Sequence, residues 1–208
     1  MKNAKNEKIG LLVIMGTKPG KEQAVKDFLL GGLSLVHAEP KTESWLAFQI
    51  NERTYGIYDT FEAEEGRQAH LTGEVAKALL ANAGELLDDF DASRDIKTID
   101  LIASNHKSGN QNNGLLVIMK AKEGKTGEVE DFLQAGKALV GDEPATLSWY
   151  AFKINANTYA IFDTFSDDGG RNAHLTGKVA TALMENAPII LEDFEASAIQ
   201  KIDILASK

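Results

Sequence analysis

Two histidines are the residues in this sequence best suited to chemistry. His70 and His174 each stand in the word Ala-His-Leu-Thr-Gly. A histidine whose pKa lies near neutrality can take a proton from a phenol or a hydroquinol, and the anion that remains is electron-rich enough to react with oxygen. In the structural alternative, the same side chain hydrogen-bonds the end of a neighbouring strand or bridges a bend in its helix. The sequence leaves both interpretations open.

An arginine precedes each histidine by three residues. Arg67 and Arg171 therefore lie about one helical turn away from the histidines, on the same side of the helix. They are candidates for holding an anionic oxygen of a substrate. Asp59 and Asp163 stand within apolar strand segments, where an unpaired charge is costly. We therefore expect each arginine to pair with its aspartate, or with a nearby glutamate.

Four aromatic residues in strand-like segments are candidates for substrate binding. They are Trp45, Trp149, Tyr55 and Tyr159. Their rings could stack on a flat aromatic ligand, although aromatic residues on strands more often fill a core.

The residues for several other kinds of site are missing. The chain has no cysteine, which excludes disulfides, thiolate metal sites and a cysteine nucleophile. It has 4 histidines, and His37 and His106 have no counterpart in the other half of the chain, so we expect no metal site. The serines beside the tryptophans, Ser44 and Ser148, lack a Gly-x-Ser-x-Gly word, which argues against a serine hydrolase.

Charge and hydropathy exclude further classes of partner. The formal net charge is −9, and the lysines and arginines form no basic cluster, so a nucleic-acid partner is not expected. No apolar run approaches the roughly 20 residues of a membrane span. The apolar run at Ile9–Met15 is short for a signal peptide and lacks a cleavage site after it. We therefore expect a cytoplasmic protein that does not associate with membranes.

The sequence consists of two tandem copies of one repeat. Gly10–Ser93 aligns with Gly114–Ser197 without a gap, and 49 of the 84 aligned positions are identical. We expect a first unit at residues 1–104, a polar linker at 105–113 and a second unit at 114–208.

Each copy predicts the order β-α-β-β-α-β. In the first copy a buried strand at Gly10–Met15 precedes an amphipathic helix, and a hairpin joins the strands Thr42–Ile50 and Thr54–Phe61. A second helix over Ala63–Asn82, bent at Thr72-Gly73 where a hydroxyl can cap a restarted helix, leads to the last strand. This order is that of a ferredoxin-like unit of the α+β class.

The strands are apolar on both faces. Leu46, Phe48 and Ile50 alternate with Trp45 and Ala47. Helices cover only one face of such a sheet, and the other copy offers an equivalent bare face. We therefore expect the two ferredoxin-like units to pack sheet to sheet as an intrachain pseudo-dimer, an α+β barrel. Further homo-oligomerisation stays open.

The sequence motifs of the two copies resemble those of a known family. The strand Tyr159-Ala-Ile-Phe-Asp-Thr-Phe165, followed by Gly-Arg-x-Ala-His-Leu-Thr-Gly and an alanine-rich helix, is similar to the antibiotic biosynthesis monooxygenases. The resemblance covers nearly all of both copies and implies the dimeric α+β barrel, here fused into one chain. It departs from the family at Phe61 and Phe165, where active members tend to carry a tryptophan. The Asn-Trp-His set of the haem-degrading relatives is not found.

The resemblance implies a monooxygenase that needs no cofactor and acts on a small aromatic or quinol-like substrate. On this hypothesis His70 and His174 face a cavity between each sheet and its helices. The alternative is a barrel that binds a small molecule without catalysis. If the positions that differ between the copies line the cavities, the two sites differ in shape. Those positions are Leu46 and Tyr150, Gly56 and Ala160, and Tyr58 and Phe162.

Overall fold

The computed structural model describes residues 5–208, which divide into two compact units. Unit 1 extends to Ile99 and also includes Ile204–Lys208, whereas unit 2 is Asp100–Asp203. The units therefore differ from the sequence repeats at their ends. Each unit includes the end of the last strand of the other repeat.

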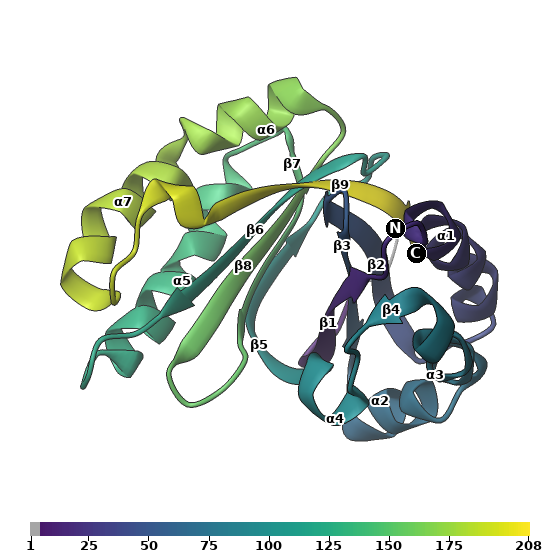
Figure 1. The fold of residues 1–208 in the computed structure, drawn as a ribbon. Helices are drawn as coiled ribbons and strands as arrows, with labels where there is room; N and C mark the ends of the chain where they lie inside the picture. The colour runs from purple at the N-terminus through teal and green to yellow at the C-terminus, as the bar shows by residue number, and fades with distance from the viewer. Residues whose placement is uncertain (1–4) are drawn as a thin grey trace. The chain divides into compact units, whose positions relative to one another are not determined.

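The first repeat follows the expected order of strands and helices and adds short elements before its last strand. Their bounds are β1 Ile9–Thr17, α1 Glu22–His37, β2 Thr42–Asn51, β3 Thr54–Phe61, α2 Glu64–Leu71, α3 Glu74–Leu86, β4 Leu87–Asp88, α4 Ala92–Asp95 and β5 Ile96–His106 (Figure 1). The short β4 pairs with the end of β1, through Gly16 and Thr17.

The second repeat follows the same plan. Its elements are β6 Asn113–Lys120, α5 Thr126–Gly141, β7 Thr146–Lys153, β8 Thr158–Phe165, α6 Asp168–Leu175, α7 Lys178–Ile190, a 3-10 turn at Ala196–Ala198, and β9 Ile199–Ser207. The bounds of α5, β8, α6 and α7 equal those of α1, β3, α2 and α3 shifted by 104 residues. Figure 1 shows α5 and α7 running along one side of β6 and β8.

The strands pair in the order of a ferredoxin-like sheet. In unit 1, β3 lies between β1 and β2, and β5 and β9 are the outer neighbours of β1 and β2. Gly10 faces Thr60 across β1 and β3, and Trp45 faces Asp59 across β2 and β3, both antiparallel. In unit 2, β8 lies between β6 and β7 in the equivalent antiparallel register. The α+β class with ferredoxin-like units is therefore confirmed.

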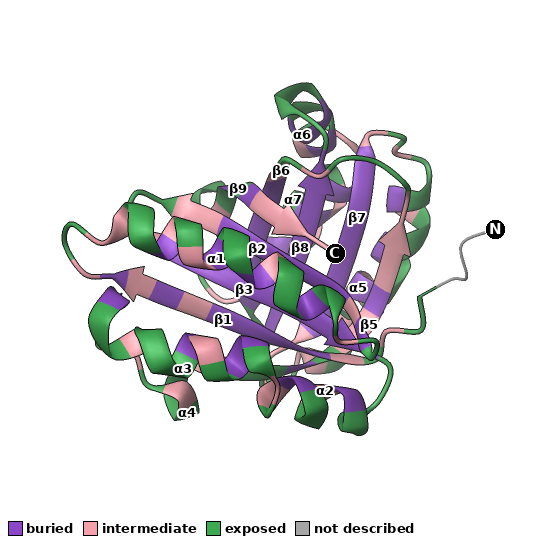
Figure 2. Cartoon of the chain, turned by 90° about the vertical axis from the view of Figure 1, so that its right-hand side faces the viewer, coloured by how far each residue is buried: buried purple, intermediate pink, exposed green. Residues whose placement is uncertain are grey.

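Both faces of the unit 1 sheet are buried, as the alternation of apolar residues predicts. Trp45, Tyr55 and Ile57 belong to a core that also includes buried residues of α1 and α3. Figure 2 shows α1 in front of β2 and β3, with buried and exposed segments alternating along the helix. On the opposite face, Phe48 and Tyr58 are fully buried as well.

The single bent helix expected over 63–82 is instead two helices. α2 ends at Leu71 and α3 begins at Glu74, because Gly73 has an extended backbone. The expected hydroxyl cap is wrong, since Thr72 Oγ1 donates back to the Gln68 carbonyl at 2.8 Å instead of capping α3. The break brings the start of α3 close to Glu39, because a Cβ placed at Gly73 would lie 2.7 Å from Glu39 Oε1.

No helix in the described part of the chain combines the length and the apolar character needed to cross a membrane.

Candidate functional site

His70 lies between two carboxylates. It projects from α2, and its Nε2 is 3.2 Å from Asp59 Oδ2 of β3. Its Nδ1 is 2.6 Å from Glu39 Oε2, in the segment between α1 and β2. His70 is 5% exposed and Asp59 is 1% exposed, so the contact is almost free of solvent. The ring also packs on Phe61, with 5.5 Å between the centroids.

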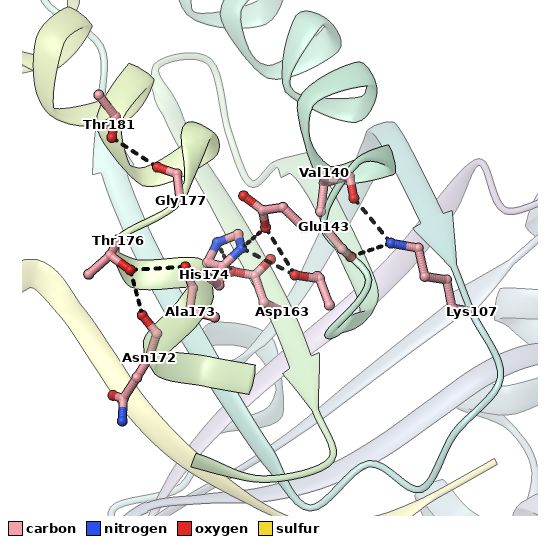
Figure 3. Close-up of polar contacts among 11 residues, drawn as sticks. Lys107, Val140, Glu143, Asp163, Asn172, Ala173, His174, Thr176, Gly177 and Thr181 are labelled. Carbon is pink, nitrogen blue, oxygen red and sulfur yellow. Dashed lines mark hydrogen bonds and ion pairs between the residues drawn. The ribbon is translucent and has the colours of Figure 1, made fainter. Parts of the chain in front are cut away.

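The second repeat builds the same cluster. His174 Nε2 is 3.2 Å from Asp163 Oδ2, and its Nδ1 is 2.5 Å from Glu143 Oε2. Thr146 Oγ1 is close to the same ring nitrogen, at 3.3 Å. Figure 3 shows His174 between the two carboxylates, which approach the ring from separate elements. Phe165 packs on the ring as Phe61 does in the first repeat.

Both histidines are imidazolium ions at neutral pH. Burial alone would lower the pKa of His70, but the charges and hydrogen bonds of Asp59 and Glu39 raise that pKa to about 9. The equivalent contacts of Asp163 and Glu143 outweigh burial and raise the pKa of His174 to about 10. Each ring nitrogen then donates to a carboxylate, and neither has a lone pair with which to accept a proton. The geometry supports the structural interpretation of these histidines.

The arginines lie elsewhere. Arg67 pairs with Glu64, and Arg171 pairs with Asp168, each one turn earlier in its own helix. Arg171 also donates to the Ile202 carbonyl at 3.1 Å. The expected pairs with Asp59 and Asp163 are therefore wrong, because the histidines contact those carboxylates. The alternative of a nearby glutamate is confirmed for Arg67, whereas the partner of Arg171 is an aspartate.

A pocket of about 240 Å³ lies in unit 1, between α1 and α3 and above β2 and β3. Trp45 and Ile57 line it from the sheet, where both are buried. Its other apolar lining includes Phe28, Leu29, Leu35 and Val75, from the two helices. The polar lining residues are Asp27 and Asn82, both solvent-exposed, so they stand at the mouth. Neither histidine and neither arginine is among the lining residues.

Trp45 is the lining residue with an unmet polar group. The residue is 1% exposed, and its indole Nε1 has no hydrogen-bond partner among residues 5–208. An unsatisfied buried donor costs about 1–3 kcal/mol. Gly32 lets α1 approach the ring, since a Cβ there would lie 3.3 Å from Trp45 Cζ2. The pocket therefore has apolar walls, and Trp45, one of its lining residues, carries a buried donor without a partner.

The other three aromatic candidates are not among the residues that line this pocket. The Tyr55 hydroxyl is 3.3 Å from both Gln49 Nε2 and the Glu22 carbonyl, where α1 begins. Tyr159 hydrogen-bonds Glu130 at 2.9 Å. Both hydroxyls thus link a hairpin to the first helix of their repeat. Trp149 is the counterpart of Trp45, and its indole Nε1 is also buried without a partner in the described structure.

No group of three or more histidine, aspartate or glutamate side chains in residues 5–208 is arranged to hold a metal ion.

The helix residues of the pocket were not foreseen from the sequence. Phe28, Leu35 and Val75 follow the helical periodicity of ordinary core residues, so the pattern does not distinguish a lining residue from a packed one. The one sequence signal for the pocket was the pair Gly31-Gly32 inside a predicted helix. Two glycines there lower the stability of the helix without a local benefit, which indicates that the space beside them has another use.

The sequence matches no protein family and no curated protein. Solved structures do match. A candidate monooxygenase from Fusobacterium nucleatum has a TM-score of 0.83 and 14% identity, over 99% of this chain and 95% of that one. A ferredoxin-fold protein from Listeria monocytogenes, related to antibiotic biosynthesis monooxygenases, has a TM-score of 0.52 and 11% identity, over 98% of both chains. This chain has the fold of the antibiotic biosynthesis monooxygenase-like proteins.

An anthrone oxidase-like protein shares this antibiotic biosynthesis monooxygenase-like fold, with a TM-score of 0.63 and 10% identity over 98% of this chain and 94% of that one. Identities this low establish a common fold and leave the chemistry to the site. The resemblance inferred from the sequence words is thus confirmed at the level of the fold.

Proposed function

We propose that this protein is a monooxygenase of the antibiotic biosynthesis type and that the pocket of unit 1 binds its substrate. The substrate class is a small neutral aromatic molecule that carries a carbonyl or hydroxyl oxygen, such as an anthrone or a quinol. Two findings support the proposal: the monooxygenase-like fold of the chain, and a pocket whose chemistry suits such a molecule.

The observation that carries the proposal is an apolar pocket lined by Trp45, whose indole N–H is buried without a partner. The volume of about 240 Å³ exceeds the roughly 150 Å³ of an apolar cavity known to hold benzene, so a molecule of two or three fused rings is a reasonable occupant. A small shift of the indole ring toward the pocket would let a carbonyl, phenol or enolate oxygen on that molecule accept from its N–H, which would remove the cost of the unsatisfied donor.

The mouth of the pocket favours uncharged molecules. Asp27 is the one ionisable residue of the lining, and the chain as a whole has a net charge of −9. Both charges repel an aromatic acid, and the apolar walls oppose burial of any ion.

With an anthrone as substrate, the reaction inserts one oxygen atom at the ring CH₂ group. Loss of one proton gives an enolate, which molecular oxygen attacks at carbon. The CH₂ group becomes a carbonyl, and the second oxygen atom leaves as water with the two hydrogens. The role proposed for Trp45 is to donate to the enolate oxygen, which stabilises the charge that makes the carbon reactive. Because His70 and His174 already donate both ring N–H groups, the proton passes to solvent at the mouth.

The second candidate function is binding without turnover. It is favoured by one observation: among the lining residues, the only ionisable group is the exposed Asp27, so the pocket has no buried base.

Oxygen uptake with anthrones and reduced quinols tests the proposal. The decisive variant is Gly31→Leu. A Cβ at Gly31 meets nothing within 4 Å, and Gly31 lines the pocket, so leucine would fill the space and also favour the helix by about 1 kcal/mol. The matched control is Gly84→Leu, at an equally open position on α3 outside the lining.

We expect uptake above the uncatalysed rate in the wild type and in Gly84→Leu, and loss of uptake in a fully folded Gly31→Leu protein. Ligand binding without uptake, lost in the same variant, would move the assignment to the binding protein. Uptake that is indifferent to Gly31→Leu would place the reaction outside this pocket and overturn the proposal.

A further inference from the structure

The His70 cluster adjoins the sheet side of the unit 1 pocket. Asp59 follows Ile57 by two residues on β3, so both side chains lie on the same face of the sheet. Trp45 on β2 is the direct partner of Asp59 in the register of the two strands. Because Ile57 and Trp45 line the pocket, the carboxylate that contacts His70 Nε2 lies next to its sheet wall.

The other carboxylate of the cluster lies at the start of α3. Glu39 Oε2 is 2.6 Å from His70 Nδ1. Its Oε1 is so close to the backbone of Gly73 that a Cβ there would lie only 2.7 Å away. Gly73 directly precedes α3, whose second residue, Val75, lines the pocket. The positive end of the helix dipole attracts the carboxylate, so Glu39 links the start of α3 to His70.

This arrangement needs a proton on each ring nitrogen of His70. An imidazolium donates to Asp59 and to Glu39 at the same time. A neutral ring keeps one N–H and turns a lone pair toward the second carboxylate, which repels it. Burial lowers the pKa of His70, but its contacts with Asp59 and Glu39 outweigh burial and raise that pKa to about 9. The double contact is therefore complete at neutral pH and is lost in alkaline solution.

Other charged groups near the cluster have different contacts. Arg67 pairs with an acid of its own helix, and Glu74 at the start of α3 pairs with a lysine at the surface. Lys208 donates to the backbone carbonyl of Glu39. Burial lowers the pKa of Lys208, so it is a second group that can lose a proton as the pH rises. A test of His70 must separate these two titrations.

We propose that His70 is a positioning residue for the unit 1 pocket: its imidazolium holds the start of α3 against the sheet, and loss of a proton from the ring loosens the lining and weakens ligand binding. The inference rests on the proposed function of that pocket. His70 acts through Asp59 and Glu39, without contact to the ligand. Because linked equilibria are reciprocal, a bound ligand must in turn favour the protonated ring.

Titration with 1-indanone across a range of pH tests the coupling. This two-ring ketone has no group that ionises between pH 7.5 and pH 10, so a pH dependence of binding belongs to the protein. We expect the dissociation constant of the wild type to rise by about tenfold over this range, which is a usual strength of coupling between two sites. In His70→Gln, binding should be weaker at pH 7.5 and nearly independent of pH. Any dependence that remains in this variant reports Lys208.

His174→Gln is the matched control. It breaks the equivalent cluster in unit 2 and removes the same kind of ion pair. The lining of the unit 1 pocket does not include Asp163 or Glu143, the residues that contact His174. Binding of 1-indanone to this variant should therefore follow pH as it does in the wild type. Circular dichroism at each pH shows whether all three proteins are folded.

The reciprocal effect provides a measurement that a purely structural role would not change. Saturation with 1-indanone should raise the titration midpoint of the His70 ring resonances, followed by NMR, by about one pH unit. One unit corresponds to the tenfold change in affinity. The midpoint of His174 should stay where it is in the free protein.

The outcomes separate this inference from the proposed function. A dissociation constant that does not change with pH, an equal change in His70→Gln, or an unmoved His70 midpoint would overturn the role of His70 while the pocket stands. Absence of binding at pH 7.5, or binding that persists in Gly31→Leu, would refute the pocket of unit 1 and this inference with it.

Discussion

At the scale of single residues, each histidine lies between a buried aspartate and a partly buried glutamate. Asp59 and Glu39 stand 11 and 31 residues before His70 in the sequence, yet both contact its ring. A buried carboxylate is stable as an ion only with a partner, and the imidazolium is a partner for two at once. The cluster ties α2 to β3 and to the end of α1, which is a structural task.

The first prediction concerns the pH dependence of stability. The pKa of His70 rises from 6.5 to about 9 on folding, and that of His174 to about 10. Their contribution is therefore fully present below pH 6.5 and is lost as the pH rises through 9 and 10. We expect urea unfolding to show a fall on the order of 3 kcal/mol per histidine across this window.

The comparison for this prediction is His70→Gln, which removes one titrating group. Its stability should change less than that of the wild type between pH 6.5 and pH 10, even though it starts lower. Equal losses in the two proteins would show that His70 does not titrate in the window. The ring resonances of His70, followed by NMR, should stay those of an imidazolium at pH 8.

At the scale of elements, a lysine hydrogen-bonds the carbonyl groups at the C-terminal end of the first helix of each repeat. Lys208 Nζ donates to the carbonyls of Val36 and Glu39, at 3.0 and 2.6 Å. Lys107 Nζ donates to those of Val140 and Glu143 (Figure 3). A cation at a helix C-terminus satisfies the last carbonyls and complements the helix dipole. In each repeat one of these two carbonyl groups belongs to the glutamate that contacts the histidine, so these contacts help to position both clusters.

The second prediction is the cost of losing such a contact. Lys208→Met keeps the length of the side chain but removes the charge and the three donors. We expect the free energy of unfolding to fall by about 1–2 kcal/mol, with faster amide exchange at the end of α1. Lys77→Met on the exposed side of α3 is the control and should change stability by less than about 0.5 kcal/mol. Equal effects of the two substitutions would contradict the assignment.

The third prediction concerns the contact of β1 with β3. A Cβ at Gly10 would lie 2.2 Å from the Asp59 carbonyl oxygen, a backbone atom that cannot move aside alone. Gly10→Ala should therefore lower the free energy of unfolding by about 2–3 kcal/mol. Gly84→Ala, in open space on α3, should instead raise it by about 0.5–1 kcal/mol. Chemical denaturation of the two variants checks both signs, and a neutral Gly10→Ala would disprove the close approach.

At the scale of the whole molecule, the boundaries of the two sequence repeats differ from those of the two compact units. Unit 1 includes Ile204–Lys208 from the far end of the chain, where the backbone N–H of Lys208 donates to the Trp45 carbonyl at 2.8 Å. β9 thus begins in unit 2, paired with β6, and ends in unit 1. A single repeat on its own would therefore lack the strand end that the other repeat contributes to its compact unit.

The fourth prediction follows from this division. Deletion of residues 204–208 should reduce hydrogen-exchange protection in β2 and at the end of α1, in unit 1, more than in unit 2. The pairing of β6 with β9 stops at Asp203, so it should persist in the shortened chain. A loss of protection confined to β6 and β8 would contradict the division into these units.

The sequence by itself determined the repeat, the order of strands and helices, the two buried faces of the sheet and the resemblance to the monooxygenase fold. These features follow from local periodicity and from words that recur after 104 residues, both of which are properties of neighbouring positions. Only the tertiary structure decided that Asp59 meets His70 instead of Arg67, and that Trp45 lines a pocket. Those outcomes depend on contacts between side chains that are distant in the sequence, and burial makes an unpaired charge in such a contact costly. Periodicity in the sequence carries no information about these contacts.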